Sequence, residues 1–298
     1  MRALVLTLLL SSALPACNRA APAGDDAAEE ARVALWRKTR LERLTSPTGW
    51  LTLAGLHWLK SGTQTVGSAE ANDLRFPAAA PAKLGTLSLD SDKITFTASE
   101  GVDVKLDGKP VQRVELVSDE HGKPTLLTSG TFSFFVIKRN DRYAIRLRDT
   151  ESKPRREFHG IEMFPARSRF RVTARWEPAD KPVEVPVPTI LGTIDKMPSP
   201  GVAAFELDGQ TLRLRPVLEE GDPRPFFIFA DATTGKTTYG AGRFLYADPP
   251  QNGQLVLDFN QSYNPPCAFT PYATCPLPPE GNKLALAIEA GEKNYGHH

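Results

Sequence analysis

The side chains best suited to chemistry lie between residues 226 and 293. Asp231, Tyr239 and Arg243 bring a carboxylate, a phenol and a permanent cation into one glycine-rich stretch. A carboxylate can act as a general base and an arginine can hold an anion, so these residues are candidates for catalysis or binding. The same side chains could instead bind one another, with Asp231 paired to Arg243 in a structural network.

Amides and tyrosines continue this region toward the C-terminus. The candidates for ligand binding are Tyr239, Asn260, Tyr263, Asn264 and Asn282. Prolines on both sides of them restrict the backbone, which is typical of loops that hold functional groups in place. We expect the ligand to be a small molecule, a glycan or a protein.

Two cysteines, Cys267 and Cys275, lie in the same region. An even pair in an exported protein predicts a disulfide, which would stiffen the loop from Asn264 to Asn282. A zinc site and free thiols are the alternatives. Zinc is disfavoured because the spacing is wider than that of paired ligands and the internal histidines are distant in sequence.

An enzymatic alternative uses the same residue types. The protein would then be an envelope hydrolase with Asp231 or Asp149 as general base and Arg243 or Arg148 holding an anion. The sequence lacks the Gly-x-Ser-x-Gly elbow, the His-Glu-x-x-His zinc helix and the glycine-rich phosphate and dinucleotide loops. We therefore expect no cofactor and no metal. In either case Asp231→Asn is expected to leave the fold intact.

The charge pattern is balanced overall and basic in one region. A net charge of +1 implies no pull toward nucleic acid, so no nucleic-acid partner is expected. Basic residues outnumber acidic ones between Lys138 and Arg175, which would attract an anionic ligand. Alternatively, several arginines simply line the outer face of a strand, because Phe170, Val172, Ala174 and Trp176 alternate with Arg169, Arg171, Thr173 and Arg175. Tyr143, Ile145 and Leu147 likewise alternate with Ala144, Arg146 and Arg148, as in a half-buried strand.

The N-terminus predicts export and lipidation. A basic residue, an apolar run and a small-residue site ending at Cys17 are typical of a bacterial lipoprotein signal over residues 1–16. Lipid on Cys17 would anchor the protein in the cell envelope, facing the periplasm, and Asn18 is compatible with the outer membrane of a Gram-negative host. An ordinary secretory signal is the alternative. Residues 17–28 are rich in Ala, Pro, Gly and acids, which predicts a disordered tether.

The remaining chain predicts a mainly β protein with a short N-terminal helix. Residues 29–59 form the helical segment, although the pattern from Gly49 to Leu59 fits helix or strand. Short strands with regular turns predict a β-sandwich over residues 60–150, followed by a second compact β domain over residues 151–298. Asp107-Gly108 and Asp208-Gly209 predict two-residue hairpin turns.

Two family resemblances follow from these patterns. The order of signals from Leu59 to Asp149 resembles the forkhead-associated (FHA) sandwich, which implies a fold but not phosphothreonine binding, because Ser68 replaces the arginine usual after the glycine at Gly67. Other segments resemble the bacterial and archaeal family known as domain of unknown function 1684, which has no established activity. The matching segments are Arg148–Asp149, Phe158–Gly160, Phe164–Pro165, Phe227–Asp231, Thr234–Arg243, Leu257–Asn282 and Glu289–Lys293.

Overall fold

The computed structural model describes residues 23–296, so the predicted signal peptide and Cys17 lie outside the described residues. Helix α1 (Ala23–Thr45) confirms the N-terminal helix but begins inside the segment expected to be a disordered tether. Contacts with a distant part of the chain explain why this segment is ordered as a helix. Carboxylates of this polar segment accept hydrogen bonds from the backbone of the second β region, Asp26 from Ser168 N at 2.9 Å and Glu30 from Ala166 N at 2.8 Å.

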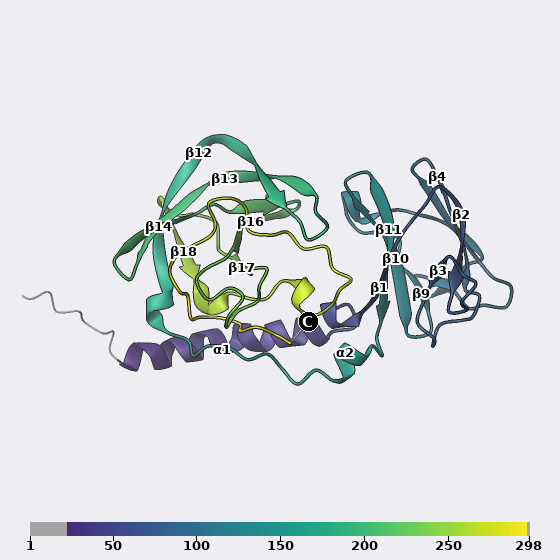
Figure 1. Cartoon of the computed structure of the whole chain (residues 1–298), viewed down its shortest axis with the longest axis horizontal. Coiled ribbons are helices and arrows are strands. Elements are labelled where there is room, and N and C mark those ends of the chain that lie inside the picture. The colour runs from purple at the N-terminus through teal and green to yellow at the C-terminus, as the bar shows by residue number, and fades with distance from the viewer. Residues whose placement is uncertain (1–22, 297–298) are drawn as a thin grey trace, which may run out of the picture.

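The first β region is a sandwich of two sheets (Figure 1). One sheet has the order β1-β11-β10-β9-β6-β7 and the other β3-β2-β4-β5-β8. The strands are β1 (Leu53–Trp58), β2 (Gly62–Gly67), β3 (Leu74–Arg75), β4 (Gly85–Asp90), β5 (Lys93–Ala98), β6 (Lys105–Leu106), β7 (Lys109–Pro110), β8 (Arg113–Leu116), β9 (Leu127–Ser129), β10 (Phe132–Arg139) and β11 (Arg142–Asp149). Phe96, Phe134 and Ile145 are fully buried between the sheets.

The ambiguous segment from Gly49 to Leu59 is mostly strand. A 3-10 turn, η1 (Trp50–Thr52), leads into β1, which pairs antiparallel with β11. The predicted turn at Asp107-Gly108 is confirmed, because both residues have positive φ, 50° and 78°, as a type I′ turn requires. Tertiary pairing with β11 therefore decides what the periodicity alone could not.

The second β region contains two further sheets. The larger has the order β14-β13-β12-β18 and the smaller β15-β16-β17. The strands are β12 (Arg171–Pro188), β13 (Ile194–Leu207), β14 (Gln210–Leu214), β15 (Val217–Glu219), β16 (Asp222–Phe229), β17 (Arg243–Tyr246) and β18 (Gln254–Asp258). Phe170, Phe227 and Phe259 are fully buried in its core. The remaining short elements are α2 (Lys153–Arg156), η2 (Asp119–His121), η3 (Ser168–Phe170), η4 (Phe259–Gln261) and η5 (Pro266–Ala268).

Helix α1 runs along the second β region and points its C-terminal end toward the first sandwich (Figure 1). Val33 and Leu44 on the helix are fully buried, and Leu44 packs against Ala268 and Phe269 of the C-terminal loops. No helix between residues 23 and 296 has both the length and the apolar composition needed to cross a bilayer. The expected fold class, mainly β with an N-terminal helix, is confirmed.

Candidate functional site

Asp231 and Arg243 lie side by side in the interior of the second β region. Arg243 Nη2 donates to Asp231 Oδ2 at 2.6 Å and to the carbonyl oxygen of Ile288 at 2.8 Å, while Nη1 donates to the carbonyl oxygen of Ala290. Arg243 is 0% exposed, and its burial lowers the pKa of the guanidinium while the Asp231 carboxylate opposes that shift. The pair joins β17 to the C-terminal loop, as in the structural network considered from the sequence.

The three candidate amides are also enclosed. Asn260, Asn264 and Asn282 are at most 1% exposed, and each Nδ2 donates to a backbone carbonyl. The acceptors are the carbonyl oxygens of Arg167, Lys293 and Ile228, at 3.0, 2.7 and 2.9 Å respectively. These side chains donate hydrogen bonds to backbone carbonyl groups of the loops, which would otherwise be buried without a hydrogen-bond donor. These amides fix the loops in place, and a ligand could bind them only by breaking their hydrogen bonds to the loop backbone.

The two candidate tyrosines have different surroundings. Tyr239 packs with Leu44, Phe158 and Phe269, and burial raises the pKa of its phenol. Tyr263 lies under helix α1, where the guanidinium carbon of Arg40 is 4.6 Å from the centre of its ring. Burial raises the pKa of Tyr263 as well. Of the predicted ligand-binding residues, Tyr263 is the one that lines the cleft described next.

A cleft of about 1000 Å³ lies between α1 and strands β12, β17 and β18. Five arginines line it, namely Arg32, Arg40, Arg43, Arg171 and Arg224. Four aromatic residues line it too: Trp36, Trp50, Tyr246 and Tyr263. The acidic lining residues are Asp248 and Asp258, so the cleft carries an excess of positive charge. The combination suits an anionic ligand that also presents flat faces.

Some of these arginines are committed to protein partners and others are not. Arg32 pairs with Glu29 and Asp258, which raises the pKa of its guanidinium. Arg40 pairs with the fully buried Glu292 at 2.8 Å. Arg224 pairs with Asp222 at 2.6 Å. By contrast, Arg43 and Arg171 are exposed, and neither makes an ion pair within residues 23–296. The cleft therefore retains uncommitted guanidinium groups.

The sequence interpretation missed most of this cleft. The arginines of the N-terminal helix were not among the candidate site residues, although Arg32, Trp36, Arg40 and Arg43 are spaced three or four residues apart. That spacing places the four side chains on one side of a helix, and this pattern could have predicted that they line a common surface. Arg171, Arg224 and Tyr246 come from separate strands, and only the folded chain brings them together.

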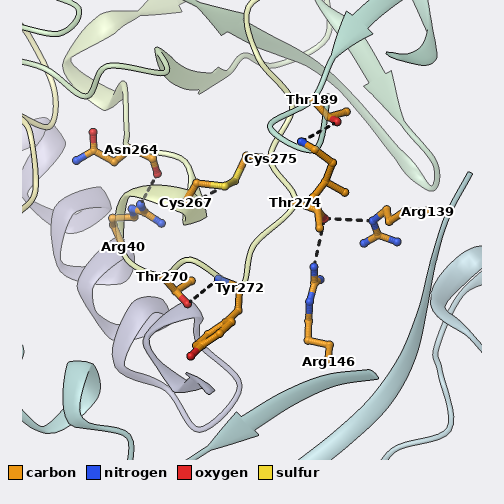
Figure 2. Close-up of a disulfide and its surroundings, with 11 residues drawn as sticks. Arg40, Arg139, Arg146, Thr189, Asn264, Cys267, Thr270, Tyr272, Thr274 and Cys275 are labelled. Carbon is orange, nitrogen blue, oxygen red and sulfur yellow. Dashed lines mark hydrogen bonds between the residues drawn. A yellow bond between two sulfur atoms is a disulfide. The ribbon is translucent and has the colours of Figure 1, made fainter. Parts of the chain in front are cut away.

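Cys267 and Cys275 lie at disulfide distance, with Cα atoms 6.2 Å apart (Figure 2). Thr274 Oγ1, beside Cys275, accepts hydrogen bonds from Arg139 Nε at 3.3 Å and from Arg146 Nη2 at 3.2 Å. Figure 2 shows both arginines directed at this hydroxyl. No three His, Cys, Asp or Glu side chains are grouped as a metal site needs, as far as the described residues extend.

The remaining candidates, Arg148 and Asp149, end strand β11 in the first sandwich, whereas Asp231 and Arg243 belong to the second β region. Asp149 is 9% exposed, and its Oδ1 accepts a hydrogen bond from Glu151 N at 2.9 Å, which closes a turn. The guanidinium carbon of Arg148 lies 5.0 Å from the ring centre of Phe135. Asp149 thus has a local structural role, and Arg148 faces the junction between the two β regions.

Comparisons with known proteins each cover part of the chain. A family model described as "Protein of unknown function (DUF1684)" matches residues 156–293. No curated protein matches the chain. The solution structure of the uncharacterized protein from gene locus rrnAC0354 of Haloarcula marismortui is 31% identical, with 48% of this chain and 81% of that chain covered and a TM-score of 0.41.

Two FHA-domain structures are also neighbours at low coverage of this chain. One is the FhaA FHA domain complexed with the intracellular domain of Rv3910, at 13% identity, 31% of this chain, 97% of that chain and a TM-score of 0.23. The other is the Rv0020c FHA structure, which is 13% identical, with 32% of this chain and 91% of that chain covered and a TM-score of 0.22. Through residues 156–293, the chain belongs to the family described as protein of unknown function DUF1684.

Proposed function

We propose that this protein is a membrane-anchored binding protein of the bacterial cell envelope and that its ligand occupies the cleft under α1. The observation that supports the proposal is the lining of that cleft. Two arginines without ion-pair partners among the described residues and four aromatic side chains line a space of about 1000 Å³. A volume at the upper end of the range for small-molecule pockets suits an extended ligand better than a single metabolite.

The chemistry of the lining selects an acidic oligosaccharide. Arginine forks match carboxylate, sulfate and phosphate groups, because they donate two parallel hydrogen bonds to paired oxygens. Aromatic side chains provide apolar surface against which a sugar ring can pack, and two partly buried ones, Trp36 and Trp50, line the cleft. A chain of sugars with acidic substituents presents both features to the cleft.

The anchor is the second component of the proposal. The sequence pattern ending at Cys17 supports lipidation of that cysteine, after which the chain would start at the lipid. Acyl chains on one terminal residue hold a protein at a membrane without a spanning helix. A binding protein held in this way would meet glycans of the envelope at short range.

Arg43 offers the sharpest test of the cleft. It lines the cleft, is exposed and makes no ion pair within the described residues, so its replacement leaves the packing unchanged. We expect the purified full chain to bind acidic oligosaccharides better than neutral ones, with affinity that falls as salt rises. Arg43→Gln should weaken binding by about tenfold, the effect of losing one charge-assisted contact.

Lys38→Gln is the matched control, because Lys38 is an exposed cation on the same helix but outside the cleft. Its binding should equal that of the unmodified protein. Calorimetric titration with a panel of acidic and neutral oligosaccharides measures both variants. Equal binding of neutral and acidic sugars, or equal losses in the two variants, would reject the cleft as the site.

A further inference from the structure

Strand β11 carries two neighbouring buried or half-buried arginines, Arg146 and Arg148, on a face where they are surrounded mainly by apolar residues. Arg146 and Arg148 are two residues apart, so both side chains leave the same face of the sheet. The neighbouring strands place Phe135 and Leu56 opposite Arg146. Phe135, Ile137 and Ala144 are buried on this outer face, with Leu56, Trp58 and Leu126 packed against them. Two cations in such surroundings need an explanation.

Arg146 is almost completely enclosed. It is 4% exposed, and desolvation together with the positive charges of Arg139 and Arg148 lowers its pKa to about 10. Its Nη2 donates to Thr274 Oγ1, and its guanidinium carbon lies 5.7 Å from the ring centre of Trp50. Its Nε is buried with no hydrogen-bond partner among the described residues. A single neutral hydroxyl does not balance a buried positive charge.

Arg148 is in a similar position beside it. It is half-buried, and its side chain makes no hydrogen bond or ion pair with any residue from 23 to 296. Arg139 adds a third guanidinium group, which pairs with Asp119 at 3.0 Å and also donates to Thr274. The charged groups at this junction are therefore three arginines and one carboxylate. Leaving two guanidinium groups desolvated and unpaired is costly unless an anion completes the cluster.

We propose that Arg146, Arg148 and Thr274 form a binding site for a tetrahedral oxyanion, either phosphate, sulfate or a phosphomonoester. The guanidinium groups supply several N–H donors, and the Thr274 hydroxyl, which already accepts from Arg139 and Arg146, can donate its proton to an anion oxygen. Arg139 is 30% exposed and Arg148 is half-buried, so the cluster is open to solvent on their side.

The position of this site links two parts of the molecule. The arginines belong to the first sandwich, whereas Thr274 belongs to the loop that holds the Cys267–Cys275 pair in the second region (Figure 2). An anion bound between them would strengthen the junction by adding charge-assisted contacts to the two existing hydrogen bonds. This site is separate from the cleft under α1, whose lining includes none of these three residues.

Thermal unfolding and calorimetric titration of the full chain test the site. Inorganic phosphate, sulfate and glycerol phosphate are compared with chloride at equal ionic strength, and the glycerol phosphate arm separates a monoester from the free ion. We expect saturable binding and a higher melting temperature with at least one tetrahedral anion. Arg146→Met should raise the melting temperature in chloride, because it removes a buried unpaired charge, and should abolish the response to the anion.

Two further variants make the result decisive. Arg148→Met, at a half-buried position, should weaken anion binding by about tenfold or more without loss of folding. Arg142→Met removes an exposed arginine of the same strand that lies over Trp58, and it should leave anion binding unchanged. The site is refuted if no anion binds saturably, or if Arg148→Met binds as tightly as Arg142→Met.

Discussion

At the scale of single residues, the polar side chains that look most suited to catalysis hold the fold together. Asp231 accepts from Arg243 on one oxygen and from Thr233 N, at 2.7 Å, on the other. A general base must reach a substrate, and Asp231 would have to leave its buried partner to do so. The pair lies where β16 and β17 meet the C-terminal loop, so the ion pair stabilises the fold at that point.

This arrangement changes the expected effect of Asp231→Asn. The substitution removes the carboxylate that is paired with Arg243, a residue that is 0% exposed. Removing one partner of a buried ion pair costs about 3–5 kcal/mol, so chemical denaturation should show a loss of that size. Glu184→Gln, which removes an exposed partner of Lys196, should cause a much smaller loss. Equal losses in the two variants would contradict a stabilising role for the buried pair.

The sequence identified which residues form polar networks but not what those networks do. Asn260, Asn264 and Asn282 stand out by type, yet the same amides can bind a ligand or satisfy loop backbone. Only burial distinguishes the two roles, and burial depends on contacts between distant segments. Arg171 was interpreted as an outward-facing residue of a strand, and it does face outward, into the cleft that α1 closes from the other side.

At the scale of elements, local patterns predicted strands and turns well. The Asp208-Gly209 turn has φ values of 50° and 75°, as its sequence predicted. The alternation along β11 correctly placed Tyr143 and Ile145 toward the sandwich core. It was wrong about the opposite face, because Ala144 and Arg146 are buried as well. A strand pattern cannot reveal that Trp50 and the disulfide loop cover its outer side.

The disulfide belongs to this scale, because it closes one loop. Cys275 is 3% exposed and packs with Val187 and Phe244, so the loop is also held by apolar contacts. A bond that closes so short a loop contributes less than the roughly 3 kcal/mol given for fifteen residues. Replacing both cysteines with alanine should therefore speed hydrogen exchange markedly between residues 260 and 282. The free energy of unfolding of the whole chain should fall much less.

Mass spectrometry of a non-reduced digest establishes the bond first, and free thiols in protein isolated from its native source would refute it. Hydrogen exchange of strands β4 and β5 serves as the internal control, because these strands lie in the first sandwich, away from the loop. Uniform loss of protection in loop and sandwich alike would show that the disulfide stabilises the whole chain and not the loop.

At the scale of the whole molecule, α1 connects the proposed anchor to the β regions. The helix begins at Ala23, shortly after Cys17 in sequence, and docks through Val33 and Leu44. Arg40 reinforces the docking by pairing with Glu292 and donating to the carbonyl oxygen of Asn264 at 3.0 Å. A lipid on Cys17 would thus hold the cleft, which α1 lines, close to the membrane surface.

Cys17→Ser tests this arrangement. Without the thiol there is no atom to carry the lipid, so the variant should either keep its signal segment uncleaved or become soluble, and its partitioning into detergent should change. The helix docks through residues that follow the anchor, so the variant should keep the melting temperature and ligand affinity of the unmodified protein. Substitution of Ser12, inside the predicted signal segment, is the control and should leave lipidation intact. Unchanged partitioning of Cys17→Ser would exclude lipid attachment at this residue, whereas loss of ligand affinity in an otherwise stable variant would show that the cleft depends on the anchor itself.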